Sequence, residues 1–174
     1  MSVSEIQIIK VEICDVIQLQ QIAKTTFFET FSEMNSEDDM KTYLEKNFSI
    51  ENLENQLNDN NTEYYFASFN NEIVGYLKLN TSSSQTEYQN DKTLEIERIY
   101  SLKTFHGKNI GQMLFNKAFE IAKSKRVDAI WLGVWEKNQR AIAFYKKNNF
   151  VEFDTHIFKL GSDNQVDIIM RREI

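Results

Sequence analysis

The sequence predicts an α/β (α+β) protein in which helices flank one mixed β-sheet. Two observations predict this class. Strand-like and helix-like patterns alternate along the 174 residues in the order β-α-α-β-β-β-α-β-α-β-β. Hydrophobic residues make up 41% of the chain and aromatic residues 13%, which is enough apolar material for a core. Because proline is absent and no Gly/Ser-rich linker interrupts the pattern, we expect a single domain over residues 1–174.

The first third of the chain predicts one strand followed by helices. Residues 6–11 form a short β-rich run, and Asp15 is a candidate N-cap for the helix that follows. Apolar residues then recur at helical spacing: Val16, Leu19, Ile22, Ala23, Phe27 and Phe31. The acidic, Asn-rich residues 33–60 carry enough further apolar positions for one or two short helices.

The middle of the chain predicts a hairpin. Residues 64–69 and 72–79 are β-rich runs separated by Asn70 and Asn71. Because asparagine tolerates positive φ, this pair of residues predicts a tight turn between two antiparallel strands. A polar loop over residues 80–92 is expected to follow the hairpin.

The last part of the chain predicts four strands and two helices. A strand with internal charges is expected over residues 94–102, and the short apolar run 129–135 predicts a buried strand. Helices are expected from about residue 110 and over residues 138–148. Two closing strands are expected on either side of residues 161–164.

The segment FHGKNIG lies where a predicted strand leads into a predicted helix. It holds Gly107 and Gly111, two of only five glycines in the chain. The first four N–H groups of a helix have no partner within the helix, and with the helix dipole they form an anion site. Lys108 adds a cation. The segment alone leaves two interpretations open, a phosphate site or a flexible helix start without a ligand.

Two named phosphate motifs do not occur in this segment. A P-loop requires GxxxxGK[ST], but Leu102 occupies the first glycine position and Asn109 the Ser/Thr position. The dinucleotide fingerprint GxGxxG is also absent from the sequence.

A second segment, WLGVWEKNQRAIAFYKKNNF, places Asn138, Ala141, Phe144, Tyr145 and Phe150 at a recognisable spacing. With FHGKNIG it resembles the GNAT N-acetyltransferase superfamily, whose pyrophosphate loop reads Q/R-x-x-G-x-G/A and whose later segment reads N-x-x-A-x-x-F-Y-x-x-x-G-F. The strand LEIERIY resembles the fourth strand of that family. Through MKTYLE, LEIERIY, IWLGVWEKN and AIAFYKK, the chain is similar to PaiA-type bacterial polyamine acetyltransferases.

The resemblance implies a GNAT-type sheet of six or seven mostly antiparallel strands. It also implies that the sheet splays between its fourth and fifth strands, here residues 94–101 and 129–135. The sequence departs from the family pattern at His106, where Gln or Arg is usual, and at Asn109 and Asn149, where glycine is usual. Because asparagine shares the left-handed conformation, we expect the backbone to keep its shape at both positions.

The resemblance further implies that the turn holds the pyrophosphate of acetyl-coenzyme A. The Ile99 N–H would bind the acetyl oxygen, Asn138 would contact the cofactor arm, and Lys147 would reach the 3′-phosphate or else be a solvated lysine at a helix end. The residues expected to bind the cofactor are Ile99, Tyr100, His106, Gly107, Lys108, Asn109, Ile110, Gly111, Gln112, Asn138, Tyr145 and Lys147.

Acetyl transfer to an amine requires a group that protonates the departing thiolate and a group that accepts the amine proton. The phenol of Tyr145 is protonated at neutral pH and matches the family's usual general acid, although it could also be a core aromatic. Glu95 and Glu97 are candidates for the base or for binding a cation. On a regular strand they would share one face with Ile99, opposite Leu94, Ile96, Arg98 and Tyr100. Alternatively, they could form ion pairs with Arg98 or Lys103.

Composition excludes several classes of ligand and partner. The formal charge is −6 and no long basic run occurs, so we expect no nucleic-acid partner. No apolar run approaches the ~20 residues of a membrane span, and the first residues lack a leader pattern, so we expect a cytoplasmic protein without membrane contact. Cys14 is the only cysteine, and His106 and His156 are far apart, so neither a disulfide nor a metal site is expected.

The resemblance and the acidity together predict a cationic small-molecule acceptor, a polyamine such as spermidine or spermine acetylated at a primary amine. Acidic residues are expected in the loops that frame the cleft: Glu33, Glu37, Asp38, Asp39, Glu87 and Asp91. Two alternatives stay open, a non-catalytic acyl-CoA-binding regulatory module and an acetyltransferase that acts on an amino acid or a protein N-terminus. Both a monomer and a homodimer are compatible with the sequence.

Overall fold

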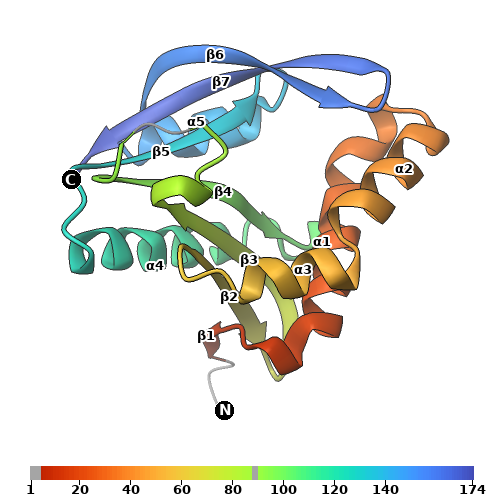
Figure 1. Ribbon diagram of the computed structural model, residues 1–174, viewed down its shortest axis with the longest axis horizontal. Helices are drawn as coiled ribbons and strands as arrows, with labels where there is room; N and C mark the ends of the chain where they lie inside the picture. The colour runs from red at the N-terminus through yellow and green to blue at the C-terminus, as the bar shows by residue number, and fades with distance from the viewer. Residues whose placement is uncertain (1–4, 88–89) are drawn as a thin grey trace.

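The computed structural model describes residues 5–87 and 90–174, and within them one seven-stranded sheet carries helices on both faces (Figure 1). The strands are β1 (Ile6–Lys10), β2 (Thr62–Phe69), β3 (Glu72–Thr81), β4 (Thr93–Ser101), β5 (Ala129–Trp135), β6 (Val151–Leu160) and β7 (Asp163–Glu173). Their order across the sheet is β1-β2-β3-β4-β5-β7-β6. Only β4 and β5 pair in parallel, which confirms the predicted mixed, mostly antiparallel sheet.

The helices form two layers over the sheet. They are α1 (Val16–Phe31), α2 (Glu37–Asn47), α3 (Ile50–Leu57), α4 (Ile110–Ser124) and α5 (Gln139–Lys147). Side chains from α1, α2 and α3 form one apolar core with the sheet, and side chains from α4 and α5 form the other. The sheet therefore lies between two cores, and both of them border the functional site.

Local sequence explains how the two short acidic helices begin. Ser36 and Ser49 are the N-caps of α2 and α3, and their hydroxyls accept hydrogen bonds from the backbone N–H groups of Asp39 and Asn52. Asp15 holds the N-cap position of α1, but its carboxylate accepts from the Glu12 N–H that precedes the helix.

The predicted hairpin turn is confirmed. Asn70 and Asn71 have φ values of 50° and 65°, the left-handed geometry of a two-residue hairpin turn. The polar segment that follows is shorter and better anchored than a free loop, because β3 continues to Thr81 and the buried Gln85 accepts from Trp131 Nε1 at 2.7 Å. Positions 88 and 89 of the expected loop lie outside the described residues.

The sheet opens between β4 and β5. The two strands pair only at Thr93–Ala129, Leu94–Ile130 and Glu95–Trp131, and beyond these pairs their ends diverge. On its other edge, β5 stays paired with β7 along its whole length. This confirms the splay that the family resemblance implied.

A β-bulge in β4 changes which side chains share a face. Lys78 pairs with Arg98 and Leu79 pairs with Ile96, so Glu97 is an extra residue on β4. From Arg98 onward each side chain therefore lies on the face opposite to the one that regular alternation would give it. Glu97 now shares a face with Arg98, toward α1 and α3, whereas Ile99 joins the core under α4. The predicted grouping of Glu95 and Glu97 with Ile99 is wrong for this reason.

Candidate active site

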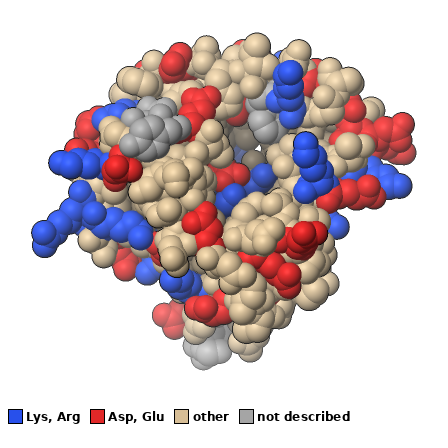
Figure 2. All heavy atoms as spheres, viewed as in Figure 1, with Lys and Arg blue, Asp and Glu red and all other residues tan. Residues whose placement is uncertain are grey.

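A cavity of about 530 Å³ fills the space where β4 and β5 diverge. Its walls come from β4, β5, the turn before α4, the first turns of α5 and the inner side of α1. Figure 2 shows a hollow near the middle of the face in view, with acidic and basic atoms side by side inside it. The cavity is therefore polar at its floor, although aromatic rings form much of its wall.

Most of the residues predicted for the site line this cavity. They are Glu95, Glu97, Ile99, Tyr100, His106, Gly107, Asn109, Ile110, Gly111, Gln112, Asn138, Tyr145 and Lys147. Lys108 does not line the cavity; its ammonium lies 4.5 Å from the centre of the Phe105 ring. The cation of the FHGKNIG segment therefore packs on a neighbouring side chain.

The turn before α4 has the backbone shape expected of a phosphate loop. Asn109 and Asn149 have φ values of 67° and 66°, so both asparagines adopt the left-handed conformation predicted for the missing glycines. Gly107 is also left-handed, with φ of 78°. The Asn109 side chain makes no capping bond, which leaves the first N–H groups of α4 available to an anion.

The space beside Gly111, in the first turn of α4, is open. A Cβ added at this position would meet only Phe144 Cζ, at 4.0 Å. The space beside the first turn of α4 is therefore large enough for a ligand to contact the backbone.

The backbone of Ile99 faces the gap. The Leu102 N–H donates to the Val74 carbonyl of β3 at 2.9 Å, and N–H groups alternate in direction along a strand. The amides of Ile99 and Ser101 therefore point to the opposite edge of β4, where β5 has diverged. His106 agrees with this assignment, since its Nε2 donates to the Ser101 carbonyl at 3.2 Å.

Arg140, which the sequence interpretation missed, also lines the cavity. Its Nη1 donates to His106 Nδ1 at 2.8 Å, so the ring links this cation to β4. Burial and the nearby Arg140 charge lower the pKa of His106, which keeps the imidazole neutral and able to accept this bond. The sequence did contain a signal for Arg140, because this cation falls in the first turn of the predicted helix that begins after Asn138.

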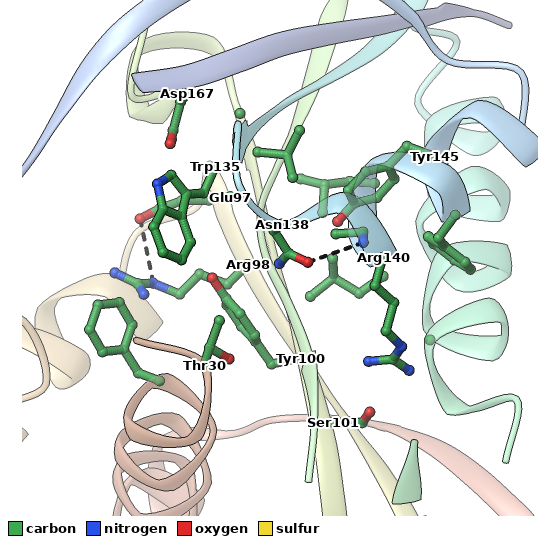
Figure 3. Close-up of a pocket in the computed structure, with 18 of the residues that line it drawn as sticks. Thr30, Glu97, Arg98, Tyr100, Ser101, Trp135, Asn138, Arg140, Tyr145 and Asp167 are labelled. Carbon is green, nitrogen blue, oxygen red and sulfur yellow. Dashed lines mark hydrogen bonds and ion pairs between the residues drawn. The ribbon is translucent and has the colours of Figure 1, made fainter. Parts of the chain in front are cut away.

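Tyr145 is both a core aromatic and a cavity residue. Its ring packs against Phe144 and Phe150, with centroids 5.4 and 5.7 Å away, and its hydroxyl points into the cavity (Figure 3). Burial, with a smaller effect from Tyr100, raises the pKa of Tyr145 above its ordinary value of 10.0. The phenol therefore stays protonated and able to donate.

Asn138 fixes the start of the helix that carries Tyr145. Its Oδ1 accepts from the Ala141 N–H at 3.1 Å, the N-cap bond of α5 (Figure 3). Asn138 therefore has a structural role as the N-cap of α5, and its Nδ2 makes no hydrogen bond within the described residues that would prevent it from meeting a ligand.

Glu97 is held in an ion-paired cluster. Its carboxylate lies 2.5 Å from Lys78 Nζ and 3.7 Å from Arg98 Nε, and it accepts from Asn80 Nδ2 at 2.6 Å. Burial alone would raise the pKa of Glu97, but Lys78 and Arg98 together hold it below its ordinary value. Glu97 therefore matches the ion-pair alternative, with Lys78 as the principal partner.

Glu95 lies in a different environment. It accepts hydrogen bonds from the Thr86 hydroxyl, from the Thr86 N–H at 2.8 Å and from Asn80 Nδ2 at 3.0 Å. Burial, and then the negative charge of Glu97, raise the pKa of Glu95. Of the two predicted carboxylates, Glu95 is therefore the one with the greater proton affinity. Neither carboxylate pairs with Lys103, whose Nζ lies 4.0 Å from Glu33 instead.

The acidic residues of the predicted cleft loops lie elsewhere. None of the six lines the cavity: Glu33, Glu37, Asp38, Asp39, Glu87 and Asp91. Asp39, for example, accepts from the Ser162 hydroxyl at 3.1 Å at the tip of the β6–β7 hairpin. The third cavity carboxylate is Asp167 of β7, which the sequence interpretation missed although it interrupts the apolar run VDIIM.

The described part of the chain contains no group of three or more His, Cys, Asp or Glu side chains arranged to hold a metal ion. No helix there has the length and apolar character needed to cross a membrane.

A sheet that splays between two parallel strands beside a left-handed turn and a helix N-terminus defines the N-acetyltransferase class. The chain belongs to the acetyltransferase (GNAT) family, whose model matches residues 19–150. Over 97% of its length it is 34% identical to an uncharacterized N-acetyltransferase of Lactobacillus delbrueckii subsp. lactis, of which 98% is covered.

A named sequence relative and a solved structure, both from Thermoplasma acidophilum, are also similar to the chain. A spermidine N(1)-acetyltransferase is 26% identical, with 91% of this chain and 93% of that protein covered. The crystal structure of a PaiA N-acetyltransferase in complex with coenzyme A is similar with a TM-score of 0.82 and 25% identity, covering 98% of this chain and 99% of that one. A probable acetyltransferase from Staphylococcus epidermidis shares the fold, with a TM-score of 0.77, 16% identity and coverage of 97% and 99%.

Proposed function

We propose that this N-acetyltransferase moves an acetyl group from acetyl-coenzyme A to a primary amine of a polyamine, by direct transfer in a ternary complex. The observation that carries the proposal is the gap between β4 and β5, with the Ile99 amide on one wall and the Tyr145 hydroxyl facing it. The gap offers an extended ligand an unpaired strand edge. The coenzyme A complex of the similar PaiA structure supports this choice of donor.

The two ends of the cavity suit the two ends of acetyl-coenzyme A. The first N–H groups of α4 would bind the pyrophosphate, with Arg140 as a nearby cation. Lys147, exposed on α5, would reach the 3′-phosphate. The backbone of Ile99 and Tyr100 would pair with the pantetheine arm, and the Ile99 N–H would stabilise the oxyanion that forms on the acetyl carbonyl.

The cavity contains a proton acceptor and a proton donor suited to acetyl transfer to an amine. An alkylammonium has no lone pair and must first lose a proton, which Glu95 would receive directly or through water. The amine nitrogen then attacks the thioester carbonyl, and the carbon–sulfur bond breaks. Tyr145 would donate its proton to the leaving sulfur and recover one from the nitrogen of the tetrahedral intermediate.

The choice of a polyamine acceptor rests on different observations from the choice of donor. The related spermidine N(1)-acetyltransferase and the three cavity carboxylates favour a cationic acceptor. One observation favours an acceptor with a carboxylate, such as an amino acid, because the guanidinium of Arg98 also lines the cavity. That guanidinium is largely engaged, since it contacts Glu97, the Tyr43 hydroxyl at 3.3 Å and the Phe48 ring.

An acceptor panel would test this proposal. The purified protein is incubated with acetyl-coenzyme A and, in turn, spermidine, spermine, an alkyl monoamine, an amino acid and a peptide, and release of the coenzyme A thiol is followed. We expect release that depends on the amine and is fastest with the two polyamines. Preference for the amino acid would replace the polyamine acceptor, and binding of acetyl-coenzyme A without any amine-dependent release would identify a non-catalytic module.

A further inference from the structure

The three carboxylates that line the cavity differ in how the protein satisfies them. Glu97 is paired with Lys78 and Arg98, and Glu95 accepts hydrogen bonds from Thr86 and Asn80. Asp167 has no such partners. Within residues 5–87 and 90–174 its carboxylate accepts no hydrogen bond, and the one charged group in contact with that carboxylate is His156, with Nε2 at 3.8 Å.

Asp167 is nevertheless largely removed from bulk water, with 15% of its side chain exposed. A carboxylate in such a place is costly unless a cation or a set of donors compensates its charge. Its oxygens remain accessible from the cavity, because Asp167 lines the wall and Figure 3 shows its carboxylate pointing inward from β7. The carboxylate of Asp167 is therefore accessible to a cationic ligand that enters the cavity.

The neighbour of Asp167 on the cavity side is an aromatic ring. Trp135 of β5 is the direct cross-strand partner of Asp167, and its indole lies below the carboxylate in Figure 3. Gly133 makes room beside them, since a Cβ there would lie 3.3 Å from Asp167 Oδ2. A carboxylate and an indole ring that lie side by side can both attract an alkylammonium group, the first by its charge and the second by a cation–π contact.

The Trp135 ring is held in place but not enclosed. The Phe31 ring packs on it with centroids 5.7 Å apart, and the exposed Lys137 lies 6.0 Å from its centre, at the limit of a cation–π contact. A ligand ammonium inside the cavity would thus meet a preformed aromatic surface.

We propose that Asp167 and Trp135 form an ammonium subsite that binds the non-reacting ammonium of a diamine or polyamine acceptor. The inference rests on the proposed function and deepens it, because it assigns the residues that would select a polyvalent amine over a monoamine. In this arrangement the reacting nitrogen of the acceptor lies toward Tyr145, and the distal ammonium neutralises the negative charge of Asp167.

Other titratable groups lie near this subsite. His156 of β6 adds a positive charge when protonated, but its Nδ1 lies 2.8 Å from Glu87 Oε1 of the polar loop, which offsets that charge. Tyr100 and Glu97 of β4 face it from across the gap. Two cations also lie near the subsite: Lys137, 6.0 Å from the centre of the Trp135 ring, and Arg98, whose guanidinium is paired with Glu97.

The test compares Asp167→Asn with a matched control, Asp154→Asn on the adjacent strand. Asp154 is exposed and lies outside the cavity wall, and its carboxylate accepts a hydrogen bond from the N–H of the adjacent Thr155. For Asp167→Asn we expect the KM of spermidine to rise about tenfold with kcat within about threefold of wild type. The KM of butylamine and the Kd of acetyl-coenzyme A should not change, and Asp154→Asn should match wild type throughout.

Each other outcome has a definite meaning. An unchanged KM for spermidine, or an equal rise for spermidine and butylamine, overturns the subsite while the acetyltransferase assignment stands. The subsite is likewise overturned if the wild-type protein acetylates butylamine in preference to spermidine. If no amine is acetylated although acetyl-coenzyme A binds, the proposed function itself fails. Trp135→Leu provides an independent check, because it should raise the KM of spermidine and spare that of butylamine.

Discussion

Lys78 Nζ lies 2.5 Å from Glu97 Oε2 at the β-bulge that precedes the gap between β4 and β5. The two side chains are 8% and 18% exposed, so the pair is nearly dry. Lys78 neutralises the charge of Glu97, which is the extra residue of the bulge. The bulge in turn determines that the Ile99 side chain packs under α4 while the Ile99 amide faces the gap. A charge pair on β3 and β4 is in this way part of the framework of the site.

Removing one member of this pair should destabilise the protein. For Lys78→Met we expect a loss of about 3 kcal/mol in the free energy of unfolding, because Glu97 is left buried without its main partner. The double variant Lys78→Met/Glu97→Gln should recover at least half of the loss, since no uncompensated charge remains. Urea denaturation of the three proteins measures this, and a loss below about 0.5 kcal/mol in the single variant would show that the pair is solvated.

Tyr145→Phe separates the two roles of Tyr145. The substitution keeps the ring that packs against Phe144 and Phe150 and deletes the hydroxyl that faces the cavity. We expect kcat to fall roughly a hundredfold, the scale of one general acid, with little change in the Kd of acetyl-coenzyme A. Normal turnover combined with weaker cofactor binding would instead assign Tyr145 to binding.

Gly111 allows the phosphate site to be tested with a matched pair of substitutions. Gly111→Glu places bulk and negative charge beside the first N–H groups of α4, and should weaken acetyl-coenzyme A binding at least about tenfold, or about 1.4 kcal/mol. Gly111→Ala should bind nearly as wild type, because its Cβ meets only Phe144 Cζ at 4.0 Å. Calorimetry gives both affinities. Equal affinities in two folded variants would mean that the pyrophosphate lies elsewhere.

The pH dependence of acceptor binding should report Asp167. Burial, together with the charge of Glu87 and against that of His156, raises the pKa of Asp167 to about 6. The carboxylate is therefore charged above that pH and neutral below it, so the KM of spermidine should rise as the pH falls through about 6. Steady-state kinetics of wild type should show this rise, and Asp167→Asn should abolish it. Because His156 also faces the subsite, His156→Gln is the control; it should keep the rise but move it to higher pH, since the His156 charge lowers the pKa of Asp167.

Much of the fold follows from local patterns in the sequence. The hairpin at Asn70 and Asn71 could be predicted because asparagine accepts positive φ, and the same reasoning holds at Asn109 and Asn149. Helical and strand periodicities located the elements, with end points that shift by a few residues. The splay, by contrast, could be expected only from the family resemblance, since it depends on long-range pairing between β4 and β5.

The chemistry of the site was harder to predict. One extra residue at Glu97 reverses the expected faces beyond it, and nothing in a period-two pattern marks a bulge in advance. The neighbourhood of Asp167 is also set by register, which brings Trp135 and His156 to either side of it across three strands. The acidic loops misled the prediction because net acidity does not tell which carboxylates face a cavity.

The most direct test of the central claim is product analysis with an isotopically labelled acetyl group. Wild-type protein is incubated with labelled acetyl-coenzyme A and spermidine, and the products are identified by mass spectrometry. If the gap between β4 and β5 holds the donor and delivers its acetyl group to a polyamine, the label will be found on a primary nitrogen of spermidine, and Tyr145→Phe will slow its appearance. Recovery of the label only as unreacted acetyl-coenzyme A or as free acetate, with the cofactor bound, would contradict the account.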